Sequence, residues 1–178
     1  MNIFVLDENP LVAATDMCDK HVPKMIVESA QMLCTAHRVL DGTSYIDYAK
    51  NGRKIQRWSH STDSQGGSTN LYKAAMVNHP CTKWVRESSD NYLWLSLHSI
   101  QLLKEFTTRF GGSHGSRSLV EMGIPGWWGG DRYGRSLLRQ PDAPTSAVLH
   151  LQQLALRRIQ LLRASQQLPL LYGWVQLS

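Results

Sequence analysis

The sequence lacks the features that mark membrane, secreted and disulfide-stabilised proteins. No apolar run approaches the roughly 20 residues that span a bilayer. The opening stretch, MNIFVLDENP, has neither the basic start nor the apolar centre of a secretion signal. The chain has three cysteines, Cys18, Cys34 and Cys81, and this small and odd number does not suit a disulfide framework. We therefore expect a cytoplasmic protein with no membrane partner.

Several catalytic signatures are also missing. The chain has no P-loop, no G-x-G-x-x-G, no G-x-S-x-G and no H-E-x-x-H, which disfavours ATP-dependent phosphoryl transfer, nicotinamide chemistry and serine hydrolysis. The pairs Cys18-x-x-His21 and Cys34-x-x-His37 have zinc-ligand spacing. On one continuous helix, however, His21 and Cys34 would lie about 20 Å apart, too far to share an ion. We expect no metal and no cofactor, and small buried thiols instead.

What is present indicates one globular, basic domain. A chain of 178 residues buries a core that folds without disulfides, so residues 1–178 are predicted to form a single domain. Lys and Arg exceed Asp and Glu by 19 − 14 = 5, which favours an anionic partner such as nucleic acid. The oligomeric state stays open.

The pattern of apolar and turn residues predicts a mainly α fold. NIFVL is typical of a short buried N-terminal strand or an extended segment, and a short helix from Pro10 to about Cys18 follows it. A long helix from His21 to Leu40 has Pro23 in its first turn, and Asp41-Gly42 ends it. Its apolar side includes Val22, Ile26 and Leu33, and the opposite polar stripe extends to Thr35 and Arg38. Asn51-Gly52, between two β-compatible runs, predicts a hairpin with a two-residue turn.

The second half of the chain is predicted to contain two further helices. A flexible polar loop, 59–70, separates the hairpin from a long buried helical region that starts at Pro80, kinks near Ser88-Ser89 and ends at Gly111-Gly112. Residues 116–178 form a basic region in which a Gly-rich aromatic loop precedes a helix. Arg157 and Arg158 of that helix are candidates for contact with phosphates.

The first candidate site is the segment CDKHVPKMIVE, which carries many reactive groups at the start of a helix. Lys24 and Glu28 are i,i+4 neighbours on a polar stripe, with His21 one turn earlier and Asp19 and Lys20 just before the helix. A solvated helix face accounts for the stripe. An amine beside a carboxylate also suits covalent catalysis, in which the amine attacks an electrophilic carbon and the carboxylate moves protons.

The second candidate site is a polar flank of the second helical region. Polar groups on a buried helix need partners, because an unpaired carboxylate there costs several kcal/mol. Hydrogen bonding between helices would provide those partners. Alternatively, the two long helices face each other across a cleft that binds substrate. The flank consists of Trp84, Glu87, Asn91, Trp94 and His98, and Asn78 and His79 precede it; the candidate substrate-binding residues are Asn78, His79, Trp84, Glu87, Asn91 and Trp94.

Four stretches, in order, carry a resemblance to a known family: MNIFVLDENP, CDKHVPKMIVESAQML, NHPCTKWVRESSDNYLWL and KEFTTRFG. Over about residues 1–115 the chain resembles phage and bacterial proteins placed with the pyrimidine-dimer DNA glycosylases. The resemblance implies a helical enzyme, in a bacterium or a phage-infected host, that acts on double-stranded DNA at a damaged or modified pyrimidine. In that family an α-amine attacks the sugar C1′ and a helix-borne Glu assists, and Glu28 matches that residue by position.

The nucleophile and the reaction remain open at this point. In that family the α-amine is freed when Met is removed before a small residue. Here Met1 precedes Asn2, which normally blocks that removal. The alternative nucleophile is the side-chain amine of Lys20 or Lys24, which would need a lowered pKa. Three functions are therefore considered. They are base excision with strand cleavage, transfer of a group to an activated pyrimidine of phage DNA, and non-catalytic binding or inhibition.

Overall fold

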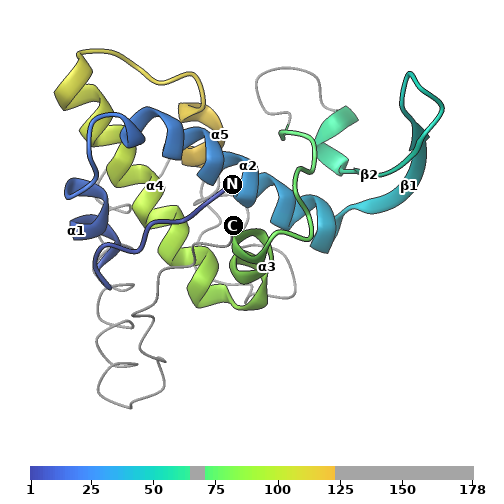
Figure 1. The fold of residues 1–178 in the computed structure, drawn as a ribbon, viewed down its shortest axis with the longest axis horizontal. Helices are drawn as coiled ribbons and strands as arrows, with labels where there is room; N and C mark the ends of the chain where they lie inside the picture. The colour runs from blue at the N-terminus through green and yellow to red at the C-terminus, as the bar shows by residue number, and fades with distance from the viewer. Residues whose placement is uncertain (65–70, 123–178) are drawn as a thin grey trace. The chain divides into compact units, whose positions relative to one another are not determined.

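The computed structural model describes residues 1–64 and 71–122. The chain divides into two units, Met1–Arg139 and Gln140–Ser178, and all described residues belong to the first. These residues are mainly helical with one two-stranded antiparallel sheet, which confirms the predicted mainly α class (Figure 1). Among them, no helix combines the length and the apolar character that a membrane crossing requires. Of the predicted loop at 59–70, residues 65–70 lie outside the described residues, as do the predicted C-terminal helix, Arg157 and Arg158.

The N-terminal segment does not form the predicted strand. Residues 1–5 have no regular structure, and the described sheet contains only the two hairpin strands. The backbone N–H of Asn2 donates to the Glu28 carboxylate instead of to a neighbouring strand. The segment leads to α1 (Pro10–Thr15), where the Asn9 side chain accepts from the Leu11 N–H and Pro10 occupies the first turn.

Helix α2 (His21–Asp41) matches the predicted long helix at both ends. Its apolar face is buried as expected, including Val22, Ile26 and Leu33. The opposite polar stripe reaches solvent only in its first half, because Thr35 and Arg38 are also buried. The segment after the loop covers them: Ala75 N–H donates to Thr35 Oγ1 at 3.1 Å.

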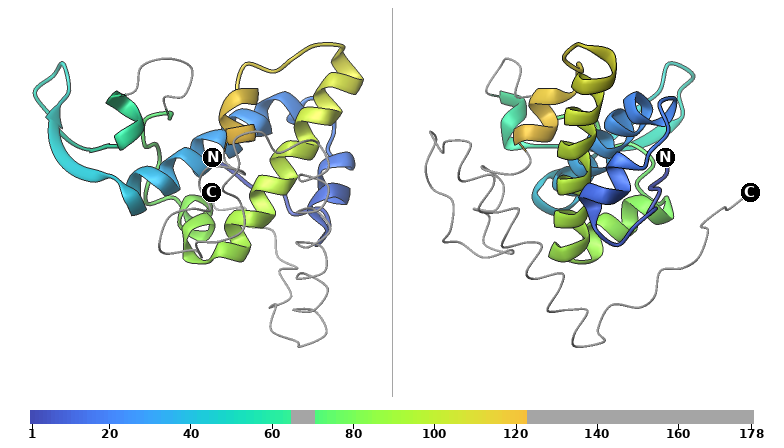
Figure 2. Two further views of the ribbon diagram at one scale, coloured as in Figure 1. Left: turned by 180° about the vertical axis from the view of Figure 1, so that it is seen from behind. Right: turned by 90° about the vertical axis from the view of Figure 1, so that its left-hand side faces the viewer.

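Strands β1 (Thr43–Tyr48) and β2 (Lys54–Ser59) form the predicted hairpin. The turn is longer than the predicted two residues. Ala49 N–H donates to Arg53 O, and Gly52 N–H donates back to Ala49 O, which leaves a three-residue loop. Gly52 has φ +77°, the left-handed conformation such loops need at their last position. The hairpin extends away from the helices as an arm, which is visible from two sides (Figures 1 and 2).

The buried Arg38 side chain anchors the base of this arm. Its guanidinium donates to the carbonyls of Trp58, Leu71 and Tyr72, and pairs through two nitrogens with both oxygens of Asp63. One side chain from α2 thus holds β2, the short 3-10 helix Ser61–Ser64 and the segment that returns from the loop. A two-stranded hairpin is marginally stable alone, so we attribute its fixed position to this anchor.

The second helical region is two helices rather than one kinked helix. Helix α3 (Pro80–Glu87) ends at Ser88, whose backbone is extended and whose hydroxyl accepts from the Asn91 N–H to cap α4 (Ser89–Phe110). Gly111, at φ +72°, ends α4 as predicted. Helix α4 packs against α1 and α2, and α3 packs against both long helices (Figure 2). A short helix that was not predicted, α5 (Arg117–Met122), follows.

Candidate functional site

Glu28 lies at the centre of the candidate site, in the exposed half of the α2 stripe. Its side chain is 14% exposed. Oε2 accepts a hydrogen bond from the Asn2 N–H at 2.7 Å and lies 3.9 Å from the α-amino nitrogen of Met1. Oε1 lies 3.6 Å from Lys24 Nζ. The carboxylate therefore stands between two amines, one from the chain end and one from its own helix.

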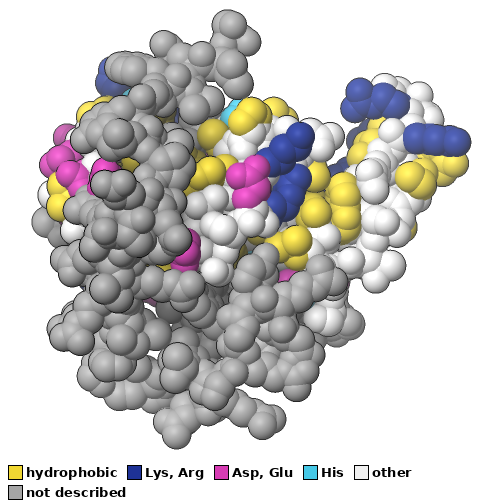
Figure 3. Space-filling view, turned by 90° about the horizontal axis from the view of Figure 1, so that it is seen from below, with side chains coloured by type: hydrophobic (Ala, Val, Ile, Leu, Met, Phe, Trp, Pro, Cys, Tyr) yellow, Lys and Arg dark blue, Asp and Glu magenta, His cyan; other side chains and the backbone are white. Residues whose placement is uncertain are grey.

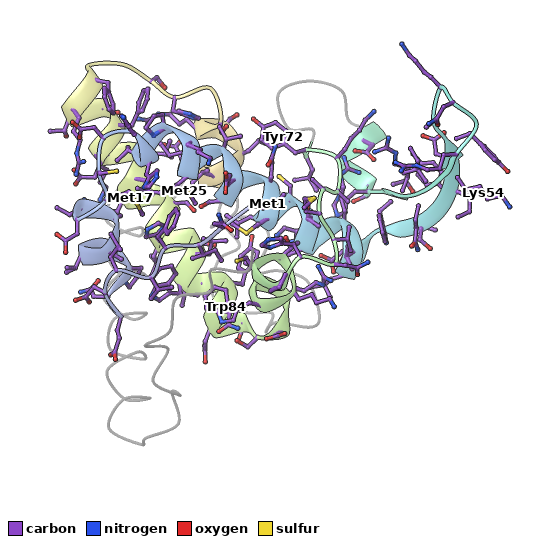
Figure 4. All side chains as sticks on the ribbon, viewed as in Figure 1. Met1, Met17, Met25, Lys54, Tyr72 and Trp84 are labelled. Atoms are coloured by element: carbon purple, nitrogen blue, oxygen red, sulfur yellow. The ribbon has the colours of Figure 1, made fainter. Side chains whose placement is uncertain are left out.

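Met1 connects this carboxylate to α3. Its side chain is 4% exposed, and its sulfur accepts from the buried Thr82 hydroxyl at 3.5 Å. Figure 4 places Met1 between α2 and α3, with Trp84 on the adjoining helix. Burial of the side chain holds the backbone nitrogen of Met1 in position beside Glu28. This is the structural link between the two predicted polar surfaces.

The other predicted site residues of the CDKHVPK segment lie in different environments. Lys24 is 64% exposed on the stripe beside Glu28. His21 stacks on Phe4, with ring centroids 5.0 Å apart. Lys20 is exposed at the N-cap of α2. Asp19 points to the far end of α4, where its Oδ1 lies 3.0 Å from Arg109 Nη1.

Arg109 explains the position of Asp19. The guanidinium also donates to the carbonyls of Thr15 and Met17, both at 2.6 Å. It thereby joins the C-terminal turn of α4 to the link between α1 and α2. Asp19 belongs to this junction, where its carboxylate pairs with the Arg109 guanidinium that joins α4 to the segment between α1 and α2.

The aromatic residues of the second flank form a stack inside the fold. The Trp84 and Trp94 rings meet edge to face at 6.1 Å, and Trp94 lies flat against His98 at 5.0 Å. Trp94 Nε1 donates to Glu8 O. The Asn91 amide donates to Trp84 O across the break between α3 and α4. In this structure Asn91 and Trp94 contact protein groups that fix the helices.

His98 ends that stack in the core. It is 1% exposed, and neither ring nitrogen has a hydrogen-bond partner among the described residues. Burial lowers the pKa of His98 to about 4, because the charged imidazolium is poorly solvated there. The ring is therefore neutral at pH 7.

The remaining candidates lie at the two ends of α3. His79 is its N-cap, and Nδ1 accepts from the Cys81 N–H at 3.3 Å. Asn78 is exposed just before it, and Glu87 is exposed at the last position of the helix. Within residues 1–64 and 71–122, no hydrogen bond or ion pair joins Glu28 to these three side chains. Glu28 is linked to α3 through Met1, which lies beside the carboxylate and accepts from Thr82 of α3.

A separate polar cluster ties the C-terminal half of α2 to α4. His37 Nδ1 lies 3.2 Å from Asp41 Oδ2, and Nε2 lies 2.7 Å from the Tyr92 hydroxyl. Burial lowers the pKa of His37 to about 4, although Asp41 opposes the shift. In the part of the chain that the structure describes, no group of three or more His, Cys, Asp or Glu side chains is arranged to hold a metal ion.

Sequence reasoning did not include Met1 among the candidate residues. The resemblance implied an α-amine as the nucleophile. Because Met1 precedes Asn2 rather than a small residue, Lys20 and Lys24 were the predicted alternatives. The contact of Met1 with Glu28 joins residues that are far apart in the chain, and no sequence periodicity predicts it. Comparisons with protein families, with curated proteins and with solved structures found no match to this chain.

Proposed function

We propose that the protein is a DNA base-excision enzyme of the glycosylase and lyase type, in which the α-amine of a retained Met1 is the nucleophile and Glu28 assists it. The substrate is double-stranded DNA that contains a damaged or modified pyrimidine. The observation that carries the proposal is the 3.9 Å separation between Met1 N and Glu28 Oε2, in a site where the Met1 side chain is buried. The resemblance over residues 1–115 supplies the type of reaction.

The chemistry uses the two groups in sequence. The neutral amine attacks C1′ of the target nucleotide, and the glycosidic bond breaks so that the base leaves with the bonding electrons and takes up a proton. The attached nitrogen loses a proton and the ring oxygen gains one as the C1′–O4′ bond breaks, which gives an iminium. Removal of a C2′ proton then expels the 3′ phosphate by breaking the C3′–O bond, and water hydrolyses the imine to release the amine. Glu28 receives and returns protons and stabilises the cation, a role that typically contributes about 10²–10⁴ in rate.

The surroundings favour Met1 over Lys24 as the nucleophile. The Met1 nitrogen is held by its buried side chain and by the Asn2 bond to Glu28. Lys24 is a flexible side chain, 64% exposed, and positioning it costs more conformational entropy.

Reductive trapping tests the proposal. The protein is incubated with duplex DNA that carries an abasic site or a pyrimidine dimer, in the presence of borohydride, which reduces an iminium to a stable amine. We expect a covalent protein–DNA adduct. A Gly-Ser extension before Met1 converts the amine to an amide and should abolish the adduct, whereas the same extension after Ser178 should leave it intact.

Two other outcomes would replace the proposal. If no adduct forms and the nucleosides of phage DNA gain mass after incubation, the protein is a DNA-modifying transferase. Binding of DNA with neither product would leave a non-catalytic binding or inhibitor protein. An adduct that survives the N-terminal extension and disappears in Lys24→Met would keep the reaction and reassign the nucleophile.

A further inference from the structure

The β1–β2 arm carries an unusual share of the charge of the chain. Residues 43–59 contain four cations and one anion, a net charge of 4 − 1 = +3 out of +5 for the whole protein. Lys50, Arg53 and Lys54 are exposed at and beside the turn. The only acidic side chain of the arm, Asp47, lies 3.5 Å from Arg57, so the three cations at the tip remain unneutralised by it.

The arm also exposes large hydrophobic side chains, Ile46 and Tyr48 on one face and Tyr45 on the other. Paired residues on neighbouring strands point to the same side of a sheet, so Ile46 opposite Gln56 and Tyr48 opposite Lys54 share a face. Ile46 is 57% exposed and Tyr48 is 62% exposed. Figure 3 shows hydrophobic side chains beside Lys and Arg side chains on the arm. Cations on an open sheet edge can be explained by protection of that edge against pairing with other strands. Exposed Ile and Tyr side chains give no such protection and need another explanation.

We infer that the arm is a DNA-contacting ribbon that lies in a groove of duplex DNA, with Lys50, Arg53 and Lys54 on phosphates and Ile46 and Tyr48 against sugars and bases. Charge complementarity identifies a polyanion as the partner. The dimensions favour a duplex. Six-residue strands span about 20 Å, and a two-stranded ribbon fits the roughly 12 Å width of the major groove.

The anchor suits such a role. Arg38 fixes the base of the arm to α2, the same helix that carries Glu28. A ribbon held in this way meets the duplex without first being ordered, which saves conformational entropy on binding. The inference shares the substrate class of the proposed function, duplex DNA, but it does not depend on amine chemistry.

The test measures binding to an undamaged, fluorescein-labelled duplex of about 20 base pairs by fluorescence anisotropy, from about 50 to 200 mM salt. Lys50→Gln/Arg53→Gln/Lys54→Gln should weaken binding and reduce the slope of log K against log salt. The reduction should be about 0.9 for each phosphate that the variant no longer neutralises, or about 2.7 for the three cations together. The matched control, Lys73→Gln/Lys83→Gln/Lys104→Gln, removes equal charge from exposed positions elsewhere and should keep the wild-type slope.

A second variant separates groove contact from charge. Ile46→Ser/Tyr48→Ser should raise Kd at least about tenfold with an unchanged salt slope, because it removes apolar burial and no cation. All five arm positions are exposed, so circular dichroism should match the wild type. Equal losses in the arm and control variants, or tighter binding to single-stranded DNA or RNA than to duplex, would overturn the inference. A failed trapping experiment with arm-dependent duplex binding would refute the amine chemistry and leave the arm in place.

Discussion

The α-amino nitrogen of Met1 lies 3.9 Å from Oε2 of Glu28, while Lys24 approaches the other oxygen of the same carboxylate. The chain end is held there by the burial of the Met1 side chain against α3 and by the Asn2 N–H, which binds the same oxygen. We propose that this amine is a nucleophile and that the carboxylate is its proton acceptor. The proposed reaction depends on this pair.

Substitution of Glu28 should separate chemistry from stability. Glu28→Gln keeps an acceptor for the Asn2 N–H but cannot take a proton, so we expect adduct formation to slow by about 10²–10⁴. The free energy of unfolding should change by less than about 1 kcal/mol, because the side chain is partly exposed and the hydrogen bond can be kept. Glu121→Gln, at an exposed position of α5, is the control and should react at the wild-type rate. A large loss of melting temperature in Glu28→Gln would make the residue structural.

The pairing of Arg38 with Asp63 predicts a pH dependence at the base of the arm. Hydrogen bonding from Arg38 lowers the pKa of Asp63 to about 2, below the value of about 3.9 in an unfolded chain. The ion pair therefore stabilises the fold fully above about pH 4, and this contribution is lost as the pH falls through about 2. Asp63→Asn should destabilise the protein at pH 7 by about 1 kcal/mol, since Asp63 is 38% exposed and solvent screens the pair. In urea titrations the difference from wild type should shrink between about pH 4 and pH 2; a constant difference would contradict the ion pair.

The buried His98 predicts a second pH dependence, at higher pH. Its pKa of about 4 lies below the unfolded value of about 6.5, so the unfolded chain binds the proton first as the pH falls. The free energy of unfolding should therefore decrease between about pH 6.5 and pH 4, by about 2 kcal/mol from pH 7 to pH 5 for this residue. His98→Leu has similar volume and no titrating group. Urea titrations at the two pH values should show a smaller decrease in the variant, and an identical decrease would show that His98 does not titrate in this way.

Gly42 should tolerate no side chain between α2 and β1. A Cβ atom there would lie 2.3 Å from Arg38 O and 2.6 Å from Ser59 O, both backbone atoms. Gly42→Ala must therefore shift the helix end or the hairpin, and we expect a cost of about 1–3 kcal/mol. Gly115→Ala is the matched control, because nothing lies within 4 Å of the added atom. Equal thermal stability of the two variants would show that the junction relaxes without cost.

The sequence predicted those elements whose signals are local. Pro10, Pro23 and Pro80 mark helix starts, Gly111 marks a helix end, and Asn51-Gly52 marks a hairpin. Periodicity on α2 predicted its buried face. Local patterns did not predict the structure where a segment contacts residues that are distant in the sequence. The apolar NIFVL run is typical of a strand, but the described residues provide no neighbouring strand for it, and Thr35 and Arg38 were expected in solvent until the segment 71–75 was seen to cover them.

The candidate site was predicted in part for the same reason. Lys24 and Glu28 are one turn apart on a helix, so their contact follows from spacing alone. The position of Met1 depends on how α3 packs on α2, which no local pattern encodes. The stack of Trp84, Trp94 and His98 was visible as a flank at helical spacing, but only the packing shows that it faces inward.

The most direct test of the account is the location of the covalent link. The borohydride-reduced adduct is digested with nuclease and protease, and the modified peptide is sequenced by mass spectrometry. We predict that the sugar remnant is attached to the α-nitrogen of a retained Met1, and that Glu28→Gln yields little or none of this peptide. Attachment to Lys24, Lys20 or any other side chain, or the absence of an adduct on dimer-containing and abasic duplexes alike, would contradict the assignment of Met1 as the nucleophile.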